Sequence, residues 1–321
     1  MRRIALLATV FVPAPALVGC QGARAGYSLL SLIGLSQKPL VVSLVIEKPE
    51  ENLQPERLIN PFSQYDALFA AMGKTVGRKV VPDLCFTFQA APNLALGVTH
   101  FAVVSPLHFA ELKQLGAFEP VAFMRDEQGR AARPALLIAA ASGPIERVED
   151  LRGKRVAFGP LRDGRTSHAA LLLLRQRGLN KADLSLEVLP IPGSLKRFPN
   201  GRAVAMSVIH SSSDAGFIDE AVWESFPDAG GDGPAKDRLR VIDRTAPTPN
   251  QLVVASPRVE RDTIDRVASF LAEVGETAPD ALRPLQAAGF APPDDELLSA
   301  CLGLLSGAPP VEASPTSAPA P

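Results

Sequence analysis

Short apolar runs alternate with helix-like segments along the first part of the chain. The run PLVVSLVIE (residues 39–47) is continuous enough for a buried parallel strand, whereas the apolar residues of PFSQYDALFAAMGKTVG (61–77) recur at helical spacing. Further strands are expected over 79–88, 100–106 and 118–124, with a helix over 108–116 between the last two. This alternation is typical of βαβ units and predicts an α/β fold.

The pattern restarts after the polar loop RDEQGRAARP. A buried strand is expected in ALLIAAAS (135–142), followed by VEDLRG (148–153), KRVAFG (154–159) and a helix from Thr166. The segment SLEVLPIP (185–192), a short helix, and AMSVIH (205–210) leading into SSSDAGFID (211–219) come next. The strand-like runs LRVIDRT (239–245) and NQLVVAS (250–256) follow, and helical spacing returns over 260–275, 279–289 and 293–306.

Two α/β patches with two crossing segments between them predict a two-lobed molecule. The crossings fall at roughly 124–136 and 243–252. Lobe 1 would comprise residues 39–125 and 250–305, and lobe 2 residues 135–242. A ligand would bind in the cleft and the lobes would close by hinge motion. A single doubly wound sheet with insertions is the alternative, and periodicity does not decide between the two.

Both ends of the chain differ in composition from the part between them. Residues 1–19 have a basic start and an apolar run interrupted by Pro13 and Pro15, which is typical of a signal peptide and too short for a good membrane span. The signal ends before Cys20, a candidate lipidation site, and residues 20–38 would form a tether. Cleavage after the A-x-A sequence at residues 23–25 is the alternative. The Pro/Ala/Ser-rich residues 306–321 are expected to be disordered.

Composition and motifs exclude several classes of protein. The formal net charge of −1 and the 6% aromatic content give no case for nucleic-acid binding. The remaining cysteines, Cys85 and Cys301, have no metal-ligand spacing; they either form a disulfide or stay as two separate buried thiols. The common nucleophile-elbow, phosphate-loop, zinc-protease and dinucleotide motifs are missing. We therefore expect no enzyme activity, no cofactor and no metal.

The join between KRVAFG and the following helix carries candidate binding residues. Thr166, Ser167 and His168 lie where a strand gives way to a helix, next to Arg165. Unpaired N–H groups at a helix start bind anions, and Arg165 would add a charge-assisted contact. The same hydroxyl residues would otherwise serve only as a helix cap.

The ordered motifs resemble those of a known family. The segment DLRGKRVAF (150–158), the helix from Thr166, the sequence PGS (192–194) and the later DAG (214–216) are similar to motifs of the phosphate/phosphite/phosphonate-type substrate-binding proteins of ABC transporters. The resemblance covers roughly residues 40–300. It implies a two-lobed fold of the periplasmic-binding-protein type II, with two mixed or parallel sheets and a hinge of two crossovers. It also implies a lipid-anchored protein of the cell envelope that passes a small oxyanion to an ABC permease.

Further site residues follow from a strand end and from the resemblance, which also has departures. Ser105, at the end of a strand, is a candidate ligand contact. Asp219 and Glu220 would contact an amino or protonated group of the ligand, or else cap a helix. Arg165, His168 and Leu195 replace a serine, a glycine and a histidine of the family motifs, and Phe88 or Gln89 stands where the family often has a tyrosine.

These departures leave other functions open. The alternatives are a sulfonate or a thiamine-type ligand, and a sensor or interaction lipoprotein with the same fold. A transferase similar to porphobilinogen deaminase is a further alternative, but it needs a cofactor-bearing cysteine in a loop.

Overall fold

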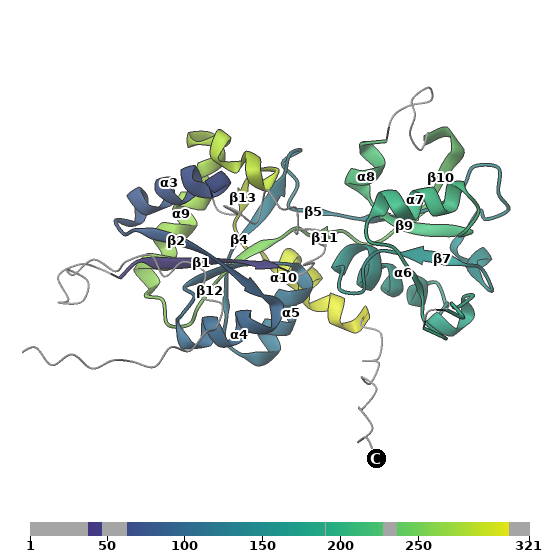
Figure 1. Ribbon diagram of the computed structural model, residues 1–321, viewed down its shortest axis with the longest axis horizontal. Coiled ribbons are helices and arrows are strands. Elements are labelled where there is room, and N and C mark those ends of the chain that lie inside the picture. Colours follow the sequence, from purple (N-terminus) through teal and green to yellow (C-terminus); the bar gives the residue numbers. More distant parts are fainter. Residues whose placement is uncertain (1–37, 47–62, 190, 227–235, 308–321) are drawn as a thin grey trace, which may run out of the picture. The chain divides into compact units, whose positions relative to one another are not determined.

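The computed structural model describes residues 38–46, 63–189, 191–226 and 236–307. All but Lys38 belong to one compact unit that spans residues 39–321. The unit is built from two mixed sheets with helices, which confirms the predicted fold class (Figure 1).

The first sheet is six-stranded, in the order β13-β4-β12-β3-β1-β2. Its strands are β1 (Leu40–Ile46), β2 (Val80–Phe86), β3 (Phe101–Val104), β4 (Glu119–Asp126), β12 (Leu252–Ala255) and β13 (Ala287–Ala291). The strand β1 pairs in parallel with β2 and β3, whereas β12 runs antiparallel to both β3 and β4. A strand from late in the chain therefore lies in the middle of a sheet whose other central strands come early.

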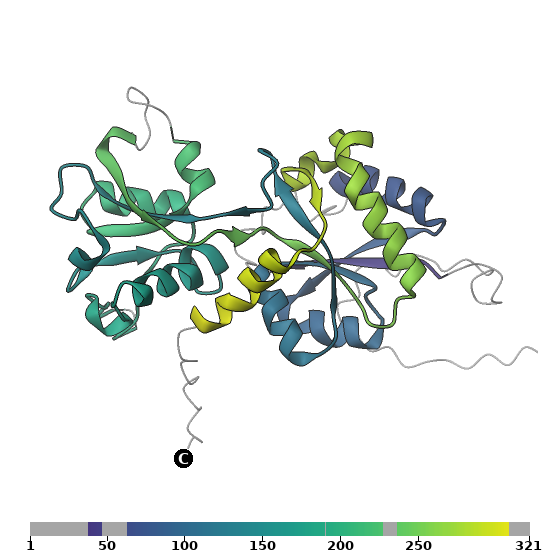
Figure 2. The same cartoon turned by 180° about the vertical axis from the view of Figure 1, so that it is seen from behind.

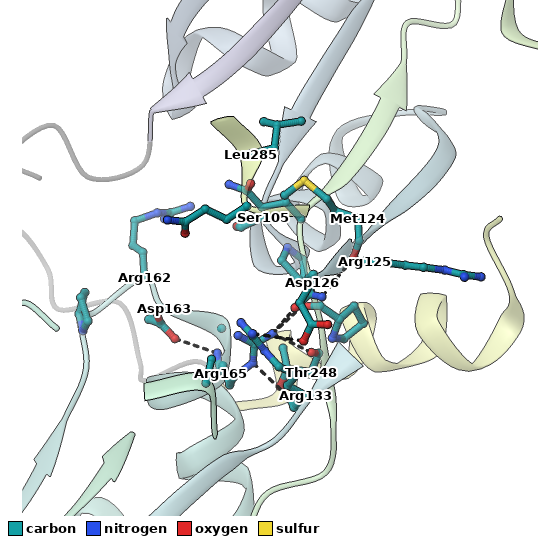
Figure 3. A pocket seen from close by; sticks show the side chains of 18 of the residues that line it. Ser105, Met124, Arg125, Asp126, Arg133, Arg162, Asp163, Arg165, Thr248 and Leu285 are labelled. Carbon is teal, nitrogen blue, oxygen red and sulfur yellow. Dashed lines mark hydrogen bonds and ion pairs between the residues drawn. The ribbon is translucent and has the colours of Figure 1, made fainter. Parts of the chain in front are cut away.

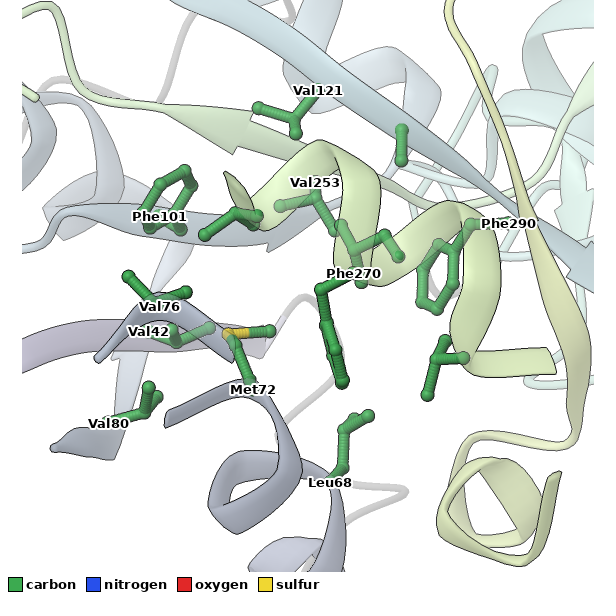
Figure 4. Packing of buried hydrophobic residues seen from close by; sticks show 14 of the residues in the cluster. Val42, Leu68, Met72, Val76, Val80, Phe101, Val121, Val253, Phe270 and Phe290 are labelled. Atoms are coloured by element: carbon green, nitrogen blue, oxygen red, sulfur yellow. The ribbon is translucent and has the colours of Figure 1, made fainter. Parts of the chain in front are cut away.

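Helices cover both faces of the first sheet. One face carries η1 (Ser63–Tyr65), α3 (Asp66–Val76), α9 (Arg261–Thr277) and η6 (Pro279–Leu285). The other carries α4 (Thr87–Leu96), α5 (Pro106–Leu115) and α10 (Asp295–Gly303), which continues as η7 (Leu304–Gly307). Figure 4 shows Leu68, Met72 and Phe270 filling the first face, and Figure 2 shows α9 lying across it. The removal of these apolar side chains from water is the main stabilising contribution to this half.

The two cysteines of the described part lie in this half as separate buried thiols. Cys85 belongs to β2 and Cys301 to α10. Burial raises the pKa of Cys85 to about 11 and that of Cys301 to about 12. Of the two alternatives, two separate buried thiols is therefore the one that the structure confirms.

The second sheet is five-stranded, in the order β10-β6-β9-β7-β8. Its strands are β6 (Ala135–Ala140), β7 (Val156–Phe158), β8 (Lys196–Arg197), β9 (Ala215–Asp219) and β10 (Leu239–Arg244). The associated helices are η2 (Val148–Leu151), η3 (Gly164–Ala169), α6 (Ala170–Gln176), η4 (Lys181–Asp183), α7 (Gly201–Ile209), α8 (Glu220–Glu224) and η5 (Lys236–Arg238). The helix α6 packs on one face and α7 on the other.

Two short strands connect the sheets. The strand β5 (Ala132–Arg133) follows β4, and β11 (Thr248–Pro249) precedes β12. They pair antiparallel, with Thr248 opposite Arg133 and Pro249 opposite Ala132. In Figure 1 both crossings run side by side between the two sheets. We call β5 and β11 together the crossover strands.

Three expectations about the elements are wrong. Residues 79–88 do not form one strand, because β2 ends at Phe86 and α4 begins at Thr87. Residues 279–289 are not a helix, because the 3-10 turn η6 is followed by β13, which adds an edge strand beside β4. The segment SLEVLPIP contributes only an isolated bridge from Glu187 to Ser194, and β8 takes the edge position beside β7.

Candidate functional site

A large pocket lies between the two sheets, with a cavity volume of about 1210 Å³. Residues from the first sheet, the second sheet and the crossover strands all line it. They include Val45, Ser105, Met124, Arg125, Asp126, Glu127, Arg133, Leu161, Arg162, Asp163, Gly164, Arg165, Arg197, Glu224, Thr248, Asn250 and Gln251. Several of them follow the ends of β3, β4 and β7, where open α/β sheets commonly bind ligands.

Arginines slightly outnumber carboxylates among the charged side chains that line the pocket. Five arginines line it, against four carboxylates. Arg125, Arg162 and Arg165 are among those labelled in Figure 3. The whole chain has a formal net charge of −1, so the excess of positive charge is local to this pocket. A pocket of this kind attracts an anion.

The helix start beside the pocket is capped by Asp163. The Asp163 carboxylate accepts hydrogen bonds from the backbone N–H groups of Arg165 (3.0 Å) and Thr166 (2.7 Å). Its carbonyl oxygen accepts from those of Ser167 and His168, both at 3.2 Å, which gives η3 its π-helical form. The chain itself therefore satisfies four of the N–H groups at this helix start.

Thr166 and Ser167 lie behind the pocket and are not among the described residues that line it. Their side chains are buried, and Ser167 has no exposed surface. A Cβ on Gly159 would lie 1.9 Å from Thr166 Oγ1, so a glycine at the end of β7 makes room for the threonine hydroxyl. Ser167 Oγ accepts a 2.8 Å hydrogen bond from Nη1 of Arg197, which does line the pocket.

His168 joins η3 to the C-terminal end of the described chain. Its Nδ1 lies 3.3 Å from the carbonyl oxygen of Leu304, and its Nε2 lies 3.2 Å from that of Leu161. Burial lowers the pKa of His168 and outweighs the two carbonyl contacts, which raise it. The imidazole is therefore neutral at pH 7 and packs in the interior instead of lining the pocket.

Arg165 points to the crossover strands. Its guanidinium donates to the carboxylate of Asp219, to the carbonyl oxygens of Arg133 (3.1 Å) and Thr248 (3.0 Å), and to Asn250 Oδ1 (2.8 Å). Figure 3 shows Arg165, Arg133 and Thr248 gathered at one end of the pocket. Asp219 also caps α8, where its carboxylate accepts from the Ala221 N–H.

A second group of ion pairs connects the β4 end to α8. Arg130 binds Asp126 at 2.9 Å, Glu220 at 3.1 Å and Glu224 at 2.9 Å. Burial opposes ionisation of Asp126, but hydrogen bonds from Arg130 outweigh it and hold the pKa of Asp126 below its ordinary value. The same arginine lowers the pKa of Glu224. Glu220 also pairs with Arg244, so both of its oxygens are held by arginines.

Ser105 and Phe88 have different places. Ser105 lines the pocket at the start of α5, where its Oγ accepts from the His108 N–H at 3.2 Å. Phe88 lies on α4, is 76% exposed and stacks on Phe86 with the ring centroids 5.8 Å apart. It is not among the described residues that line the pocket. The position of Phe88 follows from the early end of β2, which turns the residue out of the sheet.

Sequence reasoning missed Arg162, Arg197, Arg133 and Asn250 as pocket residues. Arg133 and Asn250 fall in the two segments predicted as crossings. The sequence therefore predicted that they lie between the lobes, but not that they line the pocket. Arg162 donates to Glu111 Oε2 at 2.5 Å and reaches the first-sheet helix α5 from the loop after β7. Arg197 belongs to β8, an edge strand that the apolar pattern did not predict.

The described residues give little support to other kinds of site. Within residues 38–46, 63–189, 191–226 and 236–307, no three His, Cys, Asp or Glu side chains gather as a metal site. None of the helices described has both the length and the apolar character needed to span a bilayer.

Two α/β units joined by paired crossover strands around a charged pocket define a solute-binding protein of the two-lobed type. The model of one family, described as the phosphonate periplasmic substrate-binding protein of an ABC transporter, matches residues 60–298. The chain belongs to this family of periplasmic substrate-binding proteins. The family consists of transport proteins that bind a substrate and are not enzymes.

Solved structures share the fold at low sequence identity. XAC2383 from Xanthomonas citri, bound to ATP, is 19% identical, with a TM-score of 0.63 over 84% of this chain and 97% of that one. PhnD1 from Prochlorococcus marinus, in complex with methylphosphonate, is 13% identical, with a TM-score of 0.59 over 83% and 97%. A binding protein component of an ABC phosphonate transporter, PA3383 from Pseudomonas aeruginosa, is 15% identical, with a TM-score of 0.55 over 82% and 84%. At these identities the likeness concerns the fold.

Proposed function

We propose that this protein captures a small oxyanion of the phosphonate, phosphite or phosphate kind in the pocket between its sheets and delivers it to an ABC importer. The excess of arginine in the pocket carries the proposal. Family membership and the methylphosphonate complex of PhnD1 agree with this class of ligand. Binding and lobe closure would complete the task without any chemistry on the ligand.

The anion would bind to Arg197 and Arg162 near Ser105, and not to the start of η3. Asp163 already accepts from the N–H groups there, and its carboxylate would repel an anion. Arg162 extends from its loop on the Ser105 side of the pocket in Figure 3. Ser167 would act through Arg197, because its Oγ accepts from the Arg197 guanidinium. Thr166 and His168 would shape the helix behind these residues.

Calorimetry tests the proposal with phosphate, phosphite, methylphosphonate, sulfate and taurine. We expect at least one phosphorus oxyanion to bind, and Arg197→Gln to weaken its binding by about ten- to a hundredfold, since a hydrogen bond to a charged group contributes about 1.5–3 kcal/mol. Arg177→Gln is the matched control, because Arg177 pairs with Asp243 and is not among the described residues of the pocket. Binding that is equally tight in wild type and Arg197→Gln would contradict the assignment.

The size of the cavity favours a second candidate, an anion with a larger organic body. Its volume of about 1210 Å³ exceeds the roughly 300–1000 Å³ of ordinary small-molecule pockets. XAC2383, which has the same fold, was solved with ATP. ATP and longer alkylphosphonates therefore belong in the same titration, and binding of these alone would favour the second candidate.

The lipid anchor at Cys20 and export from the cytoplasm are part of the proposal. Cys20 lies outside the described residues, so the proposal rests on the signal-like residues 1–19 that precede it. Cys20→Ala should move the protein from the membrane fraction to the soluble fraction and abolish incorporation of labelled palmitate. Wild type that carries no lipid, with an N-terminus after Ala25, would favour the alternative cleavage site.

A further inference from the structure

The side chain of Arg165 connects the second sheet to both crossover strands. Arg165 belongs to η3, and its side chain is only 12% exposed. The Nε atom donates to the carbonyl oxygen of Arg133 in β5, and Nη2 donates to that of Thr248 in β11. Arg133 and Thr248 are opposite each other in the crossover pairing. One guanidinium therefore binds both crossover strands at the same pair of residues.

Asn250 extends this connection to the first sheet. Its Oδ1 accepts from Arg165 Nη2 at 2.8 Å. Its Nδ2 donates to the carbonyl oxygens of Met124 (3.1 Å) and Arg130 (2.8 Å), at the end of β4 and in the loop after it. The amide therefore joins the first crossing, the second crossing and Arg165 in one set of hydrogen bonds.

Asp219 completes the set from the second sheet. Its carboxylate at the end of β9 accepts from Arg165 and, at 3.3 Å, from Arg133 Nη2. All three guanidinium nitrogens of Arg165 thus have acceptors within the protein. A planar guanidinium suits such a site because it presents donors in fixed directions, which a lysine ammonium cannot do.

We propose that Arg165 is a positioning residue that fixes the orientation of the second lobe on the crossover strands, and not a contact to the ligand. A ligand that bound this guanidinium would have to break bonds to Asp219, Asn250 or the crossover carbonyls. Holding η3 against the hinge fixes the angle at which Arg162 and Arg197 face the first lobe. The inference goes beyond the proposed ligand, and its two structural measurements are made on the ligand-free protein.

The test measures the distance between the lobes in the ligand-free protein. Spin labels replace the exposed Lys74 on α3 and Arg202 on α7, in a Cys20→Ala background, since Cys85 and Cys301 are buried. We expect Arg165→Gln and Arg165→Lys to broaden the distance distribution relative to the Arg165 protein. Arg177→Gln is the matched control, because Arg177 pairs with Asp243 inside the second lobe, and it should leave the distribution unchanged. A merely structural role would lower the melting temperature and leave the distance distribution unchanged.

Hydrogen exchange gives a second measurement that separates a positioning role of Arg165 from a contact to the ligand. Loss of the Arg165 bonds should accelerate exchange of the backbone amides of residues 131–133, Thr248 and Asn250 by about ten- to a hundredfold. Asn250→Ala should have the same effect with Arg165 intact, and it carries the test if the Arg165 variants do not fold. An unchanged distance distribution and unchanged exchange in folded Arg165→Gln would overturn the inference. That result together with weaker methylphosphonate binding would make Arg165 a ligand contact.

Discussion

His168 is a buried titratable group whose surroundings favour its neutral form. Its pKa in the folded protein lies below the ordinary value of 6.5, mainly because of burial. The unfolded chain therefore binds the proton more readily, and the free energy of unfolding decreases as the pH falls through about 6.5 towards the lower folded value. His100 acts in the same direction, since burial also lowers its pKa.

Replacing His168 should therefore flatten the dependence of stability on pH. We expect His168→Gln to lose less free energy of unfolding than wild type between about pH 7.5 and about pH 5.5. Urea unfolding at several pH values measures this directly. If the variant loses as much stability on acidification as wild type does, His168 does not titrate in the way its burial indicates.

At the scale of residues, the sequence predicted where polar groups gather better than it predicted which way they point. The join after β7 does border the pocket, but Thr166 and Ser167 face inward. The orientation of Thr166 depends on the space beside Gly159, and that of Ser167 on Arg197, which lies on a strand that was not predicted. Asp163, which caps the helix, was not singled out, although an aspartate just before a helix is a common cap.

The segment from α10 to η7 makes a contact between helices of both lobes. Leu304 is 3% exposed and packs against Leu107 of α5 and Ala169 of η3. The next residues add a contact from Arg175 to the carbonyl oxygen of Ser306. This short segment therefore joins the C-terminal end of the first lobe to the second.

Leu304→Ala should be strongly destabilising. We expect a loss of about 2–5 kcal/mol in the free energy of unfolding, as for other buried leucines replaced by alanine. Leu302→Ala is the matched control, because Leu302 is 44% exposed, and it should change stability by less than about 0.5 kcal/mol. Denaturant unfolding distinguishes the two leucine variants. By contrast, a truncation after Gly307 should leave the melting temperature at the wild-type value. Equal effects of the two leucine changes would contradict the role of Leu304.

At the scale of elements, most strands and helices were predictable from periodicity, and the errors have local causes. Pro284 ends the helical spacing before Ala287, and the small residues AAGFA then form β13 because β4 offers an open edge. That pairing is a tertiary effect which no local pattern contains. Phe86 and Phe88 read as strand residues in isolation, yet Gln89 caps the start of α4 by accepting from the Phe86 N–H.

At the scale of the whole molecule, the pocket lies between two sheets that the strands β5 and β11 connect, and a closing motion would bend the chain at these two strands. Under the proposed function, ligand should therefore make the protein more compact. We expect the radius of gyration from X-ray scattering to fall at saturating methylphosphonate and to stay constant in Arg197→Gln at the same concentration. Identical scattering profiles with and without a bound ligand would contradict closure.

The sequence predicted the two crossings because the strand–helix alternation stops and restarts at the polar segment RDEQGRAARP. It did not predict that the crossings pair with each other, or that arginines from three parts of the chain converge beside them. Such convergence depends on sheet order, and the order of the first sheet includes pairings between residues more than a hundred positions apart.

That order has a consequence for how the chain folds during synthesis. Every strand of the second sheet lies within residues 135–244, so this half can form its hydrogen bonds from a continuous stretch. The strands β3 and β4 have no such option, because each of them pairs with β12, which begins at Leu252. Until that part of the chain emerges, β3 and β4 present unpaired edges of the kind that join other chains. The first lobe thus begins before the second and finishes after it, and a chain interrupted between them is the form most exposed to aggregation.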